Sequence, residues 1–251
     1  MKLKLKKLDG LVFEEAIHTY ALNGKLLPGV TTILAAKDKP FLSMWRLKIG
    51  VETIGKLWEA GKAYAEDEIK VILEAGKKAH SVKSKEALVS GKIAHAWIEK
   101  FVKAKIAGNE FAEKIEDEKA RNAVSLFYEW QKQHKIDWLA SELVLASPTY
   151  EFAGTIDAVA MVDGRLTIVD FKTSNQISDE YWLQTGAYHL LLDDNLEDKE
   201  ERPVDRLILR IPKTGDGFEA KVAPIPLDLC IKTFLALREV RKFDSWIENN
   251  K

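Results

Sequence analysis

The sequence contains one cysteine, Cys230, among 251 residues. A single thiol cannot form a disulfide framework within the chain, and it cannot supply the ligands of an iron–sulfur cluster or a Cys₄ zinc site. An excess of charge of one sign is also missing, because 38 Lys and Arg face 39 Asp and Glu for a formal net charge of −1. This balance excludes a globally basic nucleic-acid coat protein, although a local basic patch can still bind nucleic acid.

The chain also lacks any run approaching the roughly 20 apolar residues of a membrane helix. Residues 1–8 alternate Lys and Leu with no apolar run behind them, which argues against a signal peptide and predicts a half-exposed edge strand. Hydrophobic residues make up 46% of the sequence, enough for a sizeable core. We therefore expect a soluble, intracellular, cytoplasmic protein that does not bind a membrane.

Hydrophobic periodicity divides the chain into three zones. Residues 1–30 are strand-like and rich in turns, with a hairpin signal at Asn23-Gly24. Residues 30–134 show helical periodicity, and glycines are expected to separate the helices. The expected helices cover 62–75, 92–107 and 117–133. Trp97 and Trp130 fall at core-like positions, so we interpret them as packing residues.

From residue 137 onward, strand and helix patterns alternate, with a second hairpin signal at Asp163-Gly164. The expected strands cover 138–146, 152–162, 166–171, 205–211 and 217–223, and the expected helices cover 179–192 and 227–247. This order predicts an α+β fold with a mixed, α/β-type central sheet flanked by helices. The predicted division is an N-terminal hairpin and helical lobe over 1–135, which carries His95, integrated with a core over 136–251.

Two neighbouring predicted strands carry the most informative polar residues. Asp157 ends Gly154-Thr-Ile-Asp157 on one strand, and Asp170 and Lys172 lie on the next. Because residues two apart share a strand face, Asp170 and Lys172 should project together, and the tight turn can bring Asp157 across from them. Such carboxylates suit Mg²⁺ or Mn²⁺, and an ammonium can stabilise charge on a phosphate. A simple Asp–Lys surface pair explains the same pattern, and it is the commoner origin of an isolated Asp-x-Lys.

Two predicted helices add polar pairs at i, i+4 spacing, which places both members on one helix face. Gln184 and Tyr188 follow the Asp170 strand, where an amide and a phenol can hold a nucleotide or a phosphate. His95 and Glu99 form the other pair, and a histidine can join two carboxylates around a metal. Taken alone, the first pair fits a core helix with Tyr188 packed and Gln184 exposed, and the second fits a structural or surface histidine.

In chain order, these motifs are Gly-x-x-x-His-x-x-x-Glu, Gly-x-x-Asp, Asp-x-Lys and Gln-x-x-x-Tyr. The ordered set, over residues 77–190, resembles the PD-(D/E)XK nuclease superfamily and its RecB-like branch, which implies a restriction-endonuclease-like core. The N-terminal segment from His18-Thr-Tyr20 to Val30-Thr-Thr-Ile-Leu34 resembles the opening of phage-type and mitochondrial genome maintenance exonucleases. Two departures are that Asp170 stands where Glu is often found, and that Ile156 rather than Pro precedes Asp157.

The resemblance implies a role for individual residues. Asp157 and Asp170 would be catalytic metal ligands, joined by His95 and the backbone carbonyl of Phe171, and Lys172 would be the catalytic lysine. The cofactor would be Mg²⁺, which Mn²⁺ can replace, with no iron–sulfur cluster. Gln184 and Tyr188 would contact the DNA substrate.

Three further residues are expected to assist. Lys92 ends a group of lysines that can follow a phosphate backbone, although a solvated helix face explains this group equally well. Glu99 and Glu142 are candidate accessory acids.

The implied activity is metal-dependent hydrolysis of DNA phosphodiester bonds. We expect an exonuclease that acts from single-stranded or duplex ends in phage-type recombination, repair or DNA processing, in a phage or prokaryotic host. Its expected protein partner is a single-strand annealing or binding protein. Three alternatives remain open: a structure-selective or CRISPR-associated-type endonuclease without an iron–sulfur cluster, a catalytically silent DNA-binding accessory protein, and an unrelated metal-dependent phosphatase or small-molecule hydrolase.

Overall fold

The computed structural model describes residues 3–197, 205–215 and 217–250. The chain forms two compact units, a smaller one over Asp38–Lys92 and a larger one built from Met1–Lys37 and Ile93–Lys251. The boundary expected after residue 135 rests on the change from helical to mixed strand and helix patterns, and it stays a prediction. None of the described helices combines the length and the apolar character needed to cross a bilayer.

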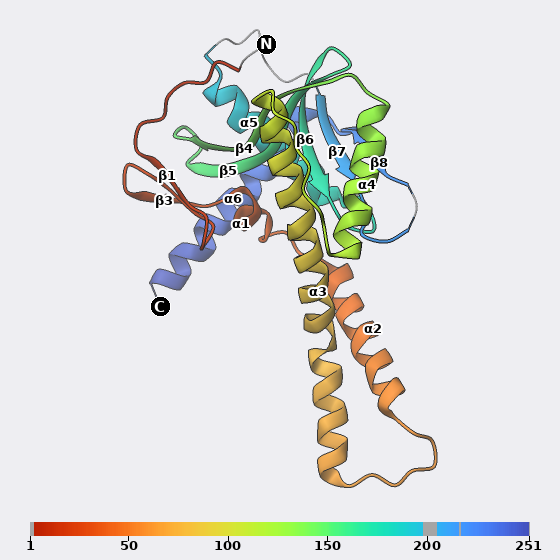
Figure 1. Ribbon diagram of the computed structural model, residues 1–251. Helices are drawn as coiled ribbons and strands as arrows, with labels where there is room; N and C mark the ends of the chain where they lie inside the picture. The colour runs from red at the N-terminus through yellow and green to blue at the C-terminus, as the bar shows by residue number, and fades with distance from the viewer. Residues whose placement is uncertain (1–2, 198–204, 216, 251) are drawn as a thin grey trace. The chain divides into compact units, whose positions relative to one another are not determined.

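A mixed five-stranded sheet with the order β4-β5-β6-β7-β8 forms the centre of the larger unit (Figure 1). Its strands are β4 (Ile136–Ser147), β5 (Phe152–Val162), β6 (Arg165–Lys172), β7 (Asp205–Arg210) and β8 (Glu219–Val222). Neighbouring strands are antiparallel except β6 and β7, which are parallel and are connected through helix α5 (Asp179–Asn195). With the closing helix α6 (Leu227–Asn249), this order confirms the predicted fold class.

Local turn chemistry sets the register of the strands that matter most. Asp163 and Gly164 have φ values of 49° and 82° and join β5 to β6 in a two-residue turn, with Val162 opposite Arg165. Positive φ at both turn residues matches the right-handed twist of the flanking strands. Strand β6 is buried along almost its whole length, as expected for a central strand covered on both faces.

Helices cover both faces of this sheet and create two apolar cores (Figure 1). Helices α5, α6 and the short α1 (Val30–Leu34) pack on one face around side chains such as Phe152 and Phe234. Helix α4 (Glu118–Lys132) and the part of α3 (Glu66–Ile106) from Ile93 onward pack on the other face. Trp97 and Trp130 lie in this second core, which confirms their predicted packing role.

A small antiparallel sheet lies at the N-terminal side of the larger unit. It comprises β1 (Leu11–Glu14), β2 (Thr19–Leu22) and β3 (Lys25–Leu27). Asn23 and Gly24 form the predicted hairpin turn, with φ values of 51° and 79°. Tyr20 and Leu27 pack against Ala146 and Ala153, so this sheet is anchored on the hairpin of β4 and β5.

The expected edge strand over residues 1–8 is wrong for residues 3–8, and residues 1 and 2 lie outside the described part of the chain. Leu5 makes only an isolated bridge to Leu196. Backbone bonds join Lys6 N to Asn195 O at 2.7 Å and Glu197 N to Lys4 O at 2.9 Å. The segment therefore lies along the end of α5, and within the described part of the chain it extends neither sheet.

The expected separation of helices by glycines is confirmed at Gly61 and Gly108, which lie outside helices with φ values of 81° and 73°. It is wrong at Gly50, Gly55, Gly76 and Gly91, which lie inside helices. Helix α3 (Glu66–Ile106) continues through Gly76, and α2 (Pro40–Leu57) continues through Gly50. A Cβ on Gly76 would lie 2.6 Å from Ile54 Cγ1 and 3.1 Å from the Gly50 carbonyl oxygen. Within the smaller unit these glycines therefore allow two helices to approach closely.

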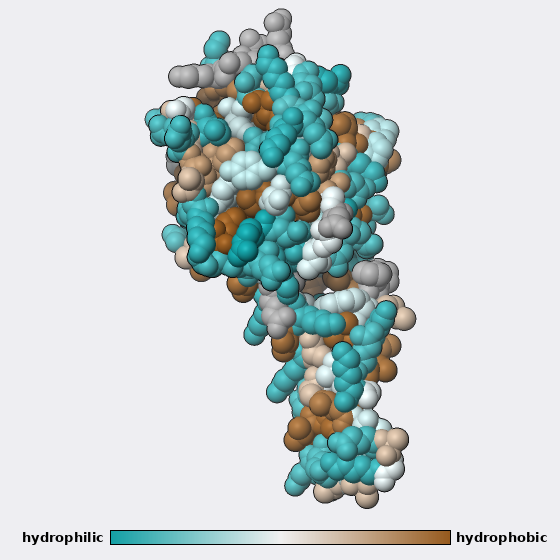
Figure 2. Space-filling view, turned by 45° about the vertical axis from the view of Figure 1, so that its right-hand side comes forward, coloured by the Kyte–Doolittle hydropathy of each residue, from teal (hydrophilic) through white to brown (hydrophobic). Residues whose placement is uncertain are grey.

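The helix pair of the smaller unit leaves several apolar side chains on its surface (Figure 2). Among the most exposed are Met44, Leu47, Val51 and Val71. A small two-helix unit buries only a limited part of its surface, so apolar side chains remain exposed on it.

Candidate active site

Polar side chains gather at the point where β5 and β6 separate. The paired residues of these strands end at Ala158 and Val169, and the next residues are Asp157 and Asp170. Beyond that point a side chain replaces the backbone ladder, because Asp157 Oδ2 accepts a hydrogen bond from Phe171 N at 2.9 Å. The carboxylate of Asp157 is thereby held against the backbone of β6.

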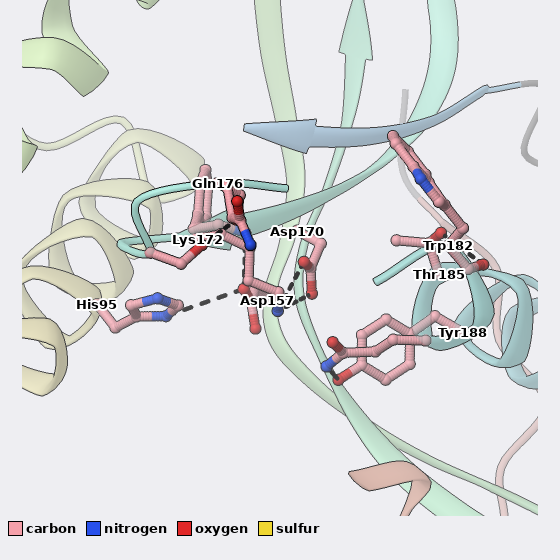
Figure 3. A network of polar contacts seen from close by, with 11 residues as sticks. His95, Asp157, Asp170, Lys172, Gln176, Trp182, Thr185 and Tyr188 are labelled. Atoms are coloured by element: carbon pink, nitrogen blue, oxygen red, sulfur yellow. Dashed lines mark hydrogen bonds and ion pairs between the residues drawn. The ribbon is translucent and has the colours of Figure 1, made fainter. Parts of the chain in front are cut away.

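Asp170 and Lys172 form a buried ion pair on one face of β6 (Figure 3). Lys172 Nζ donates to Asp170 Oδ1 at 2.9 Å and lies 2.7 Å from Oδ2. No described group donates to Oδ2 in hydrogen-bond geometry, although the Asp170 side chain is fully buried. The ammonium also lies 4.8 Å from the centroid of the Tyr181 ring, in cation–π contact.

The electrostatics of this pair favour a second cation. Burial raises the pKa of Asp170 to about 6, with Asp157 adding to the effect and Lys172 opposing it. Burial likewise raises the pKa of Asp157, against the charge of Lys172 and the hydrogen bond from Phe171 N. Burial lowers the pKa of Lys172, but the carboxylates of Asp170 and Asp157 outweigh it and the net shift is upward. Lys172 therefore stays charged while the two carboxylates remain incompletely neutralised.

His95 reaches the same centre from α3. Its Nδ1 lies 3.9 Å from Asp157 Oδ2, and its ring makes an edge contact with Phe171. Burial lowers the pKa of His95 to about 4, and the positive charge of Lys172 adds to this effect. The imidazole is therefore neutral at neutral pH, which is the form that binds metals.

Glu142 extends the line of acids to a third strand. The pairs Ser141–Ala158 and Leu143–Ile156 flank it, so its position on β4 faces Asp157 on β5. Its backbone has a φ of 47°, a left-handed conformation that is uncommon for a non-glycine residue inside a strand. Burial is the main reason that the pKa of Glu142 is raised to about 8, and the charges of Asp157 and Glu99 raise it further.

We call Glu142, Asp157 and Asp170 the acid row. Glu99 projects from α3 toward this row and forms an ion pair with Lys103 one turn further along.

Helix α5 supplies the other side of the centre. Gln184 Nε2 donates to Tyr188 Oη at 2.8 Å, and both side chains are buried. The alternative with Gln184 exposed is therefore wrong. Burial raises the pKa of Tyr188 well above its ordinary value, with further contributions from Asp157 and Asp170, so the phenol keeps its proton beside the acids. Gly154 permits this approach, because a Cβ there would lie 3.2 Å from Tyr188 Cε1.

Lys92 is exposed and belongs to the smaller unit, as do the other lysines of its group, Lys77, Lys78, Lys83 and Lys85. Its contact with the substrate stays a prediction.

Two residues near the centre were not predicted from the sequence to belong to the site. Tyr20 Oη lies 2.9 Å from Thr155 Oγ1, two residues before Asp157 on β5. Lys213 Nζ donates to the Thr173 carbonyl oxygen at 2.9 Å, and its charge contributes to the lowered pKa of His95. One feature could have identified Lys213. It follows strand β7, which is parallel to the Asp-x-Lys strand β6, so the ends of the two strands lie side by side.

The donor set fits a hard divalent cation. Among the described residues, no three His, Cys, Asp or Glu side chains close around a common point, and Lys172 supplies the positive charge beside Asp170. Two carboxylates with raised pKa values, one oxygen without a hydrogen-bond donor and a neutral imidazole are nevertheless suitable ligands for such an ion.

A family model described as the PD-(D/E)XK nuclease superfamily matches residues 63–249. The chain belongs to this superfamily. The PD-(D/E)XK match includes the acid row, Lys172, α5 and the whole of α6. The mixed sheet with flanking helices is consistent with a restriction-endonuclease-like fold. Membership indicates a metal-dependent nuclease that acts on DNA, and divalent metals such as Mg²⁺ are general in this superfamily. A search of curated proteins found no significant match.

Proposed function

We propose that this chain is a Mg²⁺-dependent deoxyribonuclease that degrades DNA from its ends. Asp157, Asp170 and Lys172 would be its catalytic residues. The observation that supports this most strongly is the buried Asp170–Lys172 pair beside the Asp157 carboxylate, at the split between β5 and β6. Burying this much charge is unfavourable unless a ligand compensates it, so a purely structural role accounts for it poorly.

The proposed ligands of the ion are Asp157, Asp170, His95 and the backbone carbonyl of Phe171. When bound, Mg²⁺ supplies Lewis-acid polarisation of the phosphate and lowers the pKa of a water molecule, and Mn²⁺ would substitute for it. Lys172 remains a cation and can hold the attacking water or a phosphate oxygen.

Other residues would orient the substrate and hold protons. Tyr188 retains its proton and can donate it in a hydrogen bond to a phosphate oxygen, while Gln184 fixes the direction of the phenol. With a pKa of about 8, Glu142 is largely protonated at neutral pH and can act as an accessory proton carrier. We assign Glu99 a supporting electrostatic role and Lys92 a DNA contact.

The N-terminal segment supports assignment to the RecB-like, phage-type exonuclease branch. The residues that carry this resemblance lie against the catalytic strand: Tyr20 contacts Thr155, and Gly29 forms a bridge to Ala153. The same assignment would place the protein in phage-type recombination or repair, with an annealing or single-strand binding protein as partner. We further propose that residues 136–251 form the nuclease core and that residues 1–135 form a lobe integrated with it.

The test compares wild type with Lys172→Ala on linear single-stranded, linear duplex and covalently closed circular DNA. Reactions contain Mg²⁺, Mn²⁺ or a chelator, and Lys232→Ala on α6 serves as the control because its side chain is 77% exposed. We expect wild type and the control to cut linear DNA with either metal. Lys172→Ala should lose about 10²-fold or more of this activity.

Each alternative predicts a different outcome. Efficient cutting of closed circles would contradict the exonuclease proposal and favour an endonuclease. DNA binding without cleavage by wild type would indicate a silent accessory protein. Equal activity in wild type and Lys172→Ala would refute the catalytic assignment.

A further inference from the structure

A pocket of about 540 Å³ lies in the larger unit between the β2–β3 hairpin and the C-terminal half of α6. Tyr20 and Lys25 line it from the hairpin side, and Arg238, Arg241 and Lys242 line it from α6. Glu151, at the turn between β4 and β5, completes the wall. We call this cavity the α6 pocket.

The α6 pocket is strongly cationic although the whole chain has a net charge of −1. Lys25, Arg238, Arg241 and Lys242 face a single lining carboxylate, that of Glu151. Outside the lining, Arg238 also pairs with Glu239, and Arg241 Nη1 lies 3.8 Å from Glu248 Oε1. This carboxylate accepts from Lys25 Nζ and, at 3.0 Å, from Arg238 Nη2. Excess positive charge in a concave site concentrates anions there, and it is unfavourable unless an anion binds.

Arg238 also has a donor without an acceptor. Its side chain is 14% exposed, and its Nη atoms bind Glu151 and Glu239. Its Nε is buried and has no hydrogen-bond partner among the described residues. A buried N–H without an acceptor is costly, so a phosphate that drew the Arg238 guanidinium toward the pocket would supply an acceptor that the described residues leave missing.

The pocket adjoins the acid row. Tyr20 forms part of its wall and contacts Thr155, which lies two residues, or about 6.6 Å along a strand, before Asp157. Two large aromatic side chains follow the basic residues on α6: Phe243 is 64% exposed and Trp246 is 62% exposed. Exposed aromatics beside cationic residues are a common platform for unpaired bases.

We propose that the α6 pocket binds a phosphate group of the substrate strand next to the one being cleaved, while Trp246 stacks on a base of that strand. This inference rests on the proposed nuclease function, because the ligand is the substrate of that site. Phosphate offers several oxygens to Arg238 Nε and the surrounding cations, and it carries the negative charge that the pocket lacks. The phosphate could be an internal phosphodiester or a terminal phosphate, and the two sources differ in their experimental signature.

The test measures binding of a fluorescent single-stranded oligonucleotide by anisotropy, in chelator so that no cleavage occurs. Lys242→Glu is compared with Lys232→Glu, an equal charge reversal at an exposed position nearer the start of α6. We expect Lys242→Glu to weaken binding at least about 10-fold more than Lys232→Glu. Lys242→Ala should also reduce the slope of log affinity against log salt by about 0.7. Trp246→Ala should weaken binding roughly 5- to 100-fold.

Equal affinities for Lys242→Glu and Lys232→Glu, with unchanged melting temperatures, would overturn the inference. Oligonucleotides with a hydroxyl or a phosphate at each end then identify the source of the bound phosphate. If Lys242→Glu loses affinity for every oligonucleotide, the bound phosphate is an internal phosphodiester. If it loses affinity only for oligonucleotides with a phosphorylated end, the bound phosphate is a terminal one.

The outcome can be separated from that of the nuclease proposal. If wild type binds and cleaves DNA but Lys242→Glu binds normally, the pocket assignment fails and the nuclease proposal stands. If Lys242→Glu loses binding but wild type never cleaves, the pocket stands and the nuclease proposal fails.

Discussion

Replacing Glu142 with Gln should stabilise the protein in alkaline solution while leaving its acid stability unchanged. Glu142 has a folded-state pKa of about 8 against an ordinary value of 4.5. Because the folded state binds this proton more tightly, its stabilising contribution is complete below pH 4.5 and is lost as the pH rises through about 8. The amide of Gln has almost the same shape as the protonated acid, so Glu142→Gln removes only the ionisation penalty.

The size of the effect follows from the gap between the two pKa values. Each unit of difference corresponds to about 1.4 kcal/mol, which gives an upper limit of roughly 4 to 5 kcal/mol at high pH. Glu142 is only half-buried, and solvent screens its charge, so we expect about 2 kcal/mol at pH 9. In a chain of this size that corresponds to a rise in melting temperature of roughly 4 to 8 °C.

The assay is urea denaturation of wild type and Glu142→Gln at pH 5, 7 and 9 in the presence of a chelator. Glu110→Gln is the control, because this residue is exposed in the loop after α3. The advantage of Glu142→Gln should grow with pH and should shrink when Mg²⁺ is added, since a bound cation compensates the acid row. If the free energy of unfolding of Glu142→Gln differs from that of wild type by the same amount at pH 5 and pH 9, the reasoning is refuted.

Three further perturbations test the packing and the metal site. Gly154→Ala places a Cβ 2.9 Å from Val30 Cγ2 and should lower the free energy of unfolding by about 1–3 kcal/mol in urea denaturation. Phe234→Ala removes a fully buried ring from the core under α6 and should cost about 3–5 kcal/mol in the same measurement. Mg²⁺ at a hundred times its dissociation constant should add about 2.7 kcal/mol of stability to wild type. Asp157→Asn should lose that gain, and equal stabilisation of both proteins would argue against Asp157 as a ligand.

The β5–β6 hairpin was predictable because its signals are local. Asp163-Gly164 specifies a two-residue turn, and this turn alone fixes which residues of the two strands face each other. Alternation along a strand then puts Asp170 and Lys172 on one face. Once the turn is identified, the approach of Asp157 to β6 follows from counting residues.

Features that depend on a partner element could not be predicted in this way. A glycine such as Gly76 is typical of a helix end, but here it leaves room for Ile54 of a second helix. The sequence does not show which helix packs against it. The Lys–Leu alternation at the N-terminus has the period of a strand, yet a strand also needs a free edge beside it. The left-handed backbone of Glu142 and the α6 pocket likewise arise from segments distant in the sequence.

The acid row links the stability of the fold to its proposed chemistry. Burial raises the pKa values of Glu142, Asp157 and Asp170, so keeping all three ionised opposes folding. An arrangement that served stability alone would lose stability when an acid was removed. Here the expected result is the reverse for Glu142→Gln, because burial and the neighbouring acids penalise the charge of Glu142 more than Lys103 compensates it. A gain in stability when an acid is removed is the behaviour expected of a site shaped by function rather than by stability.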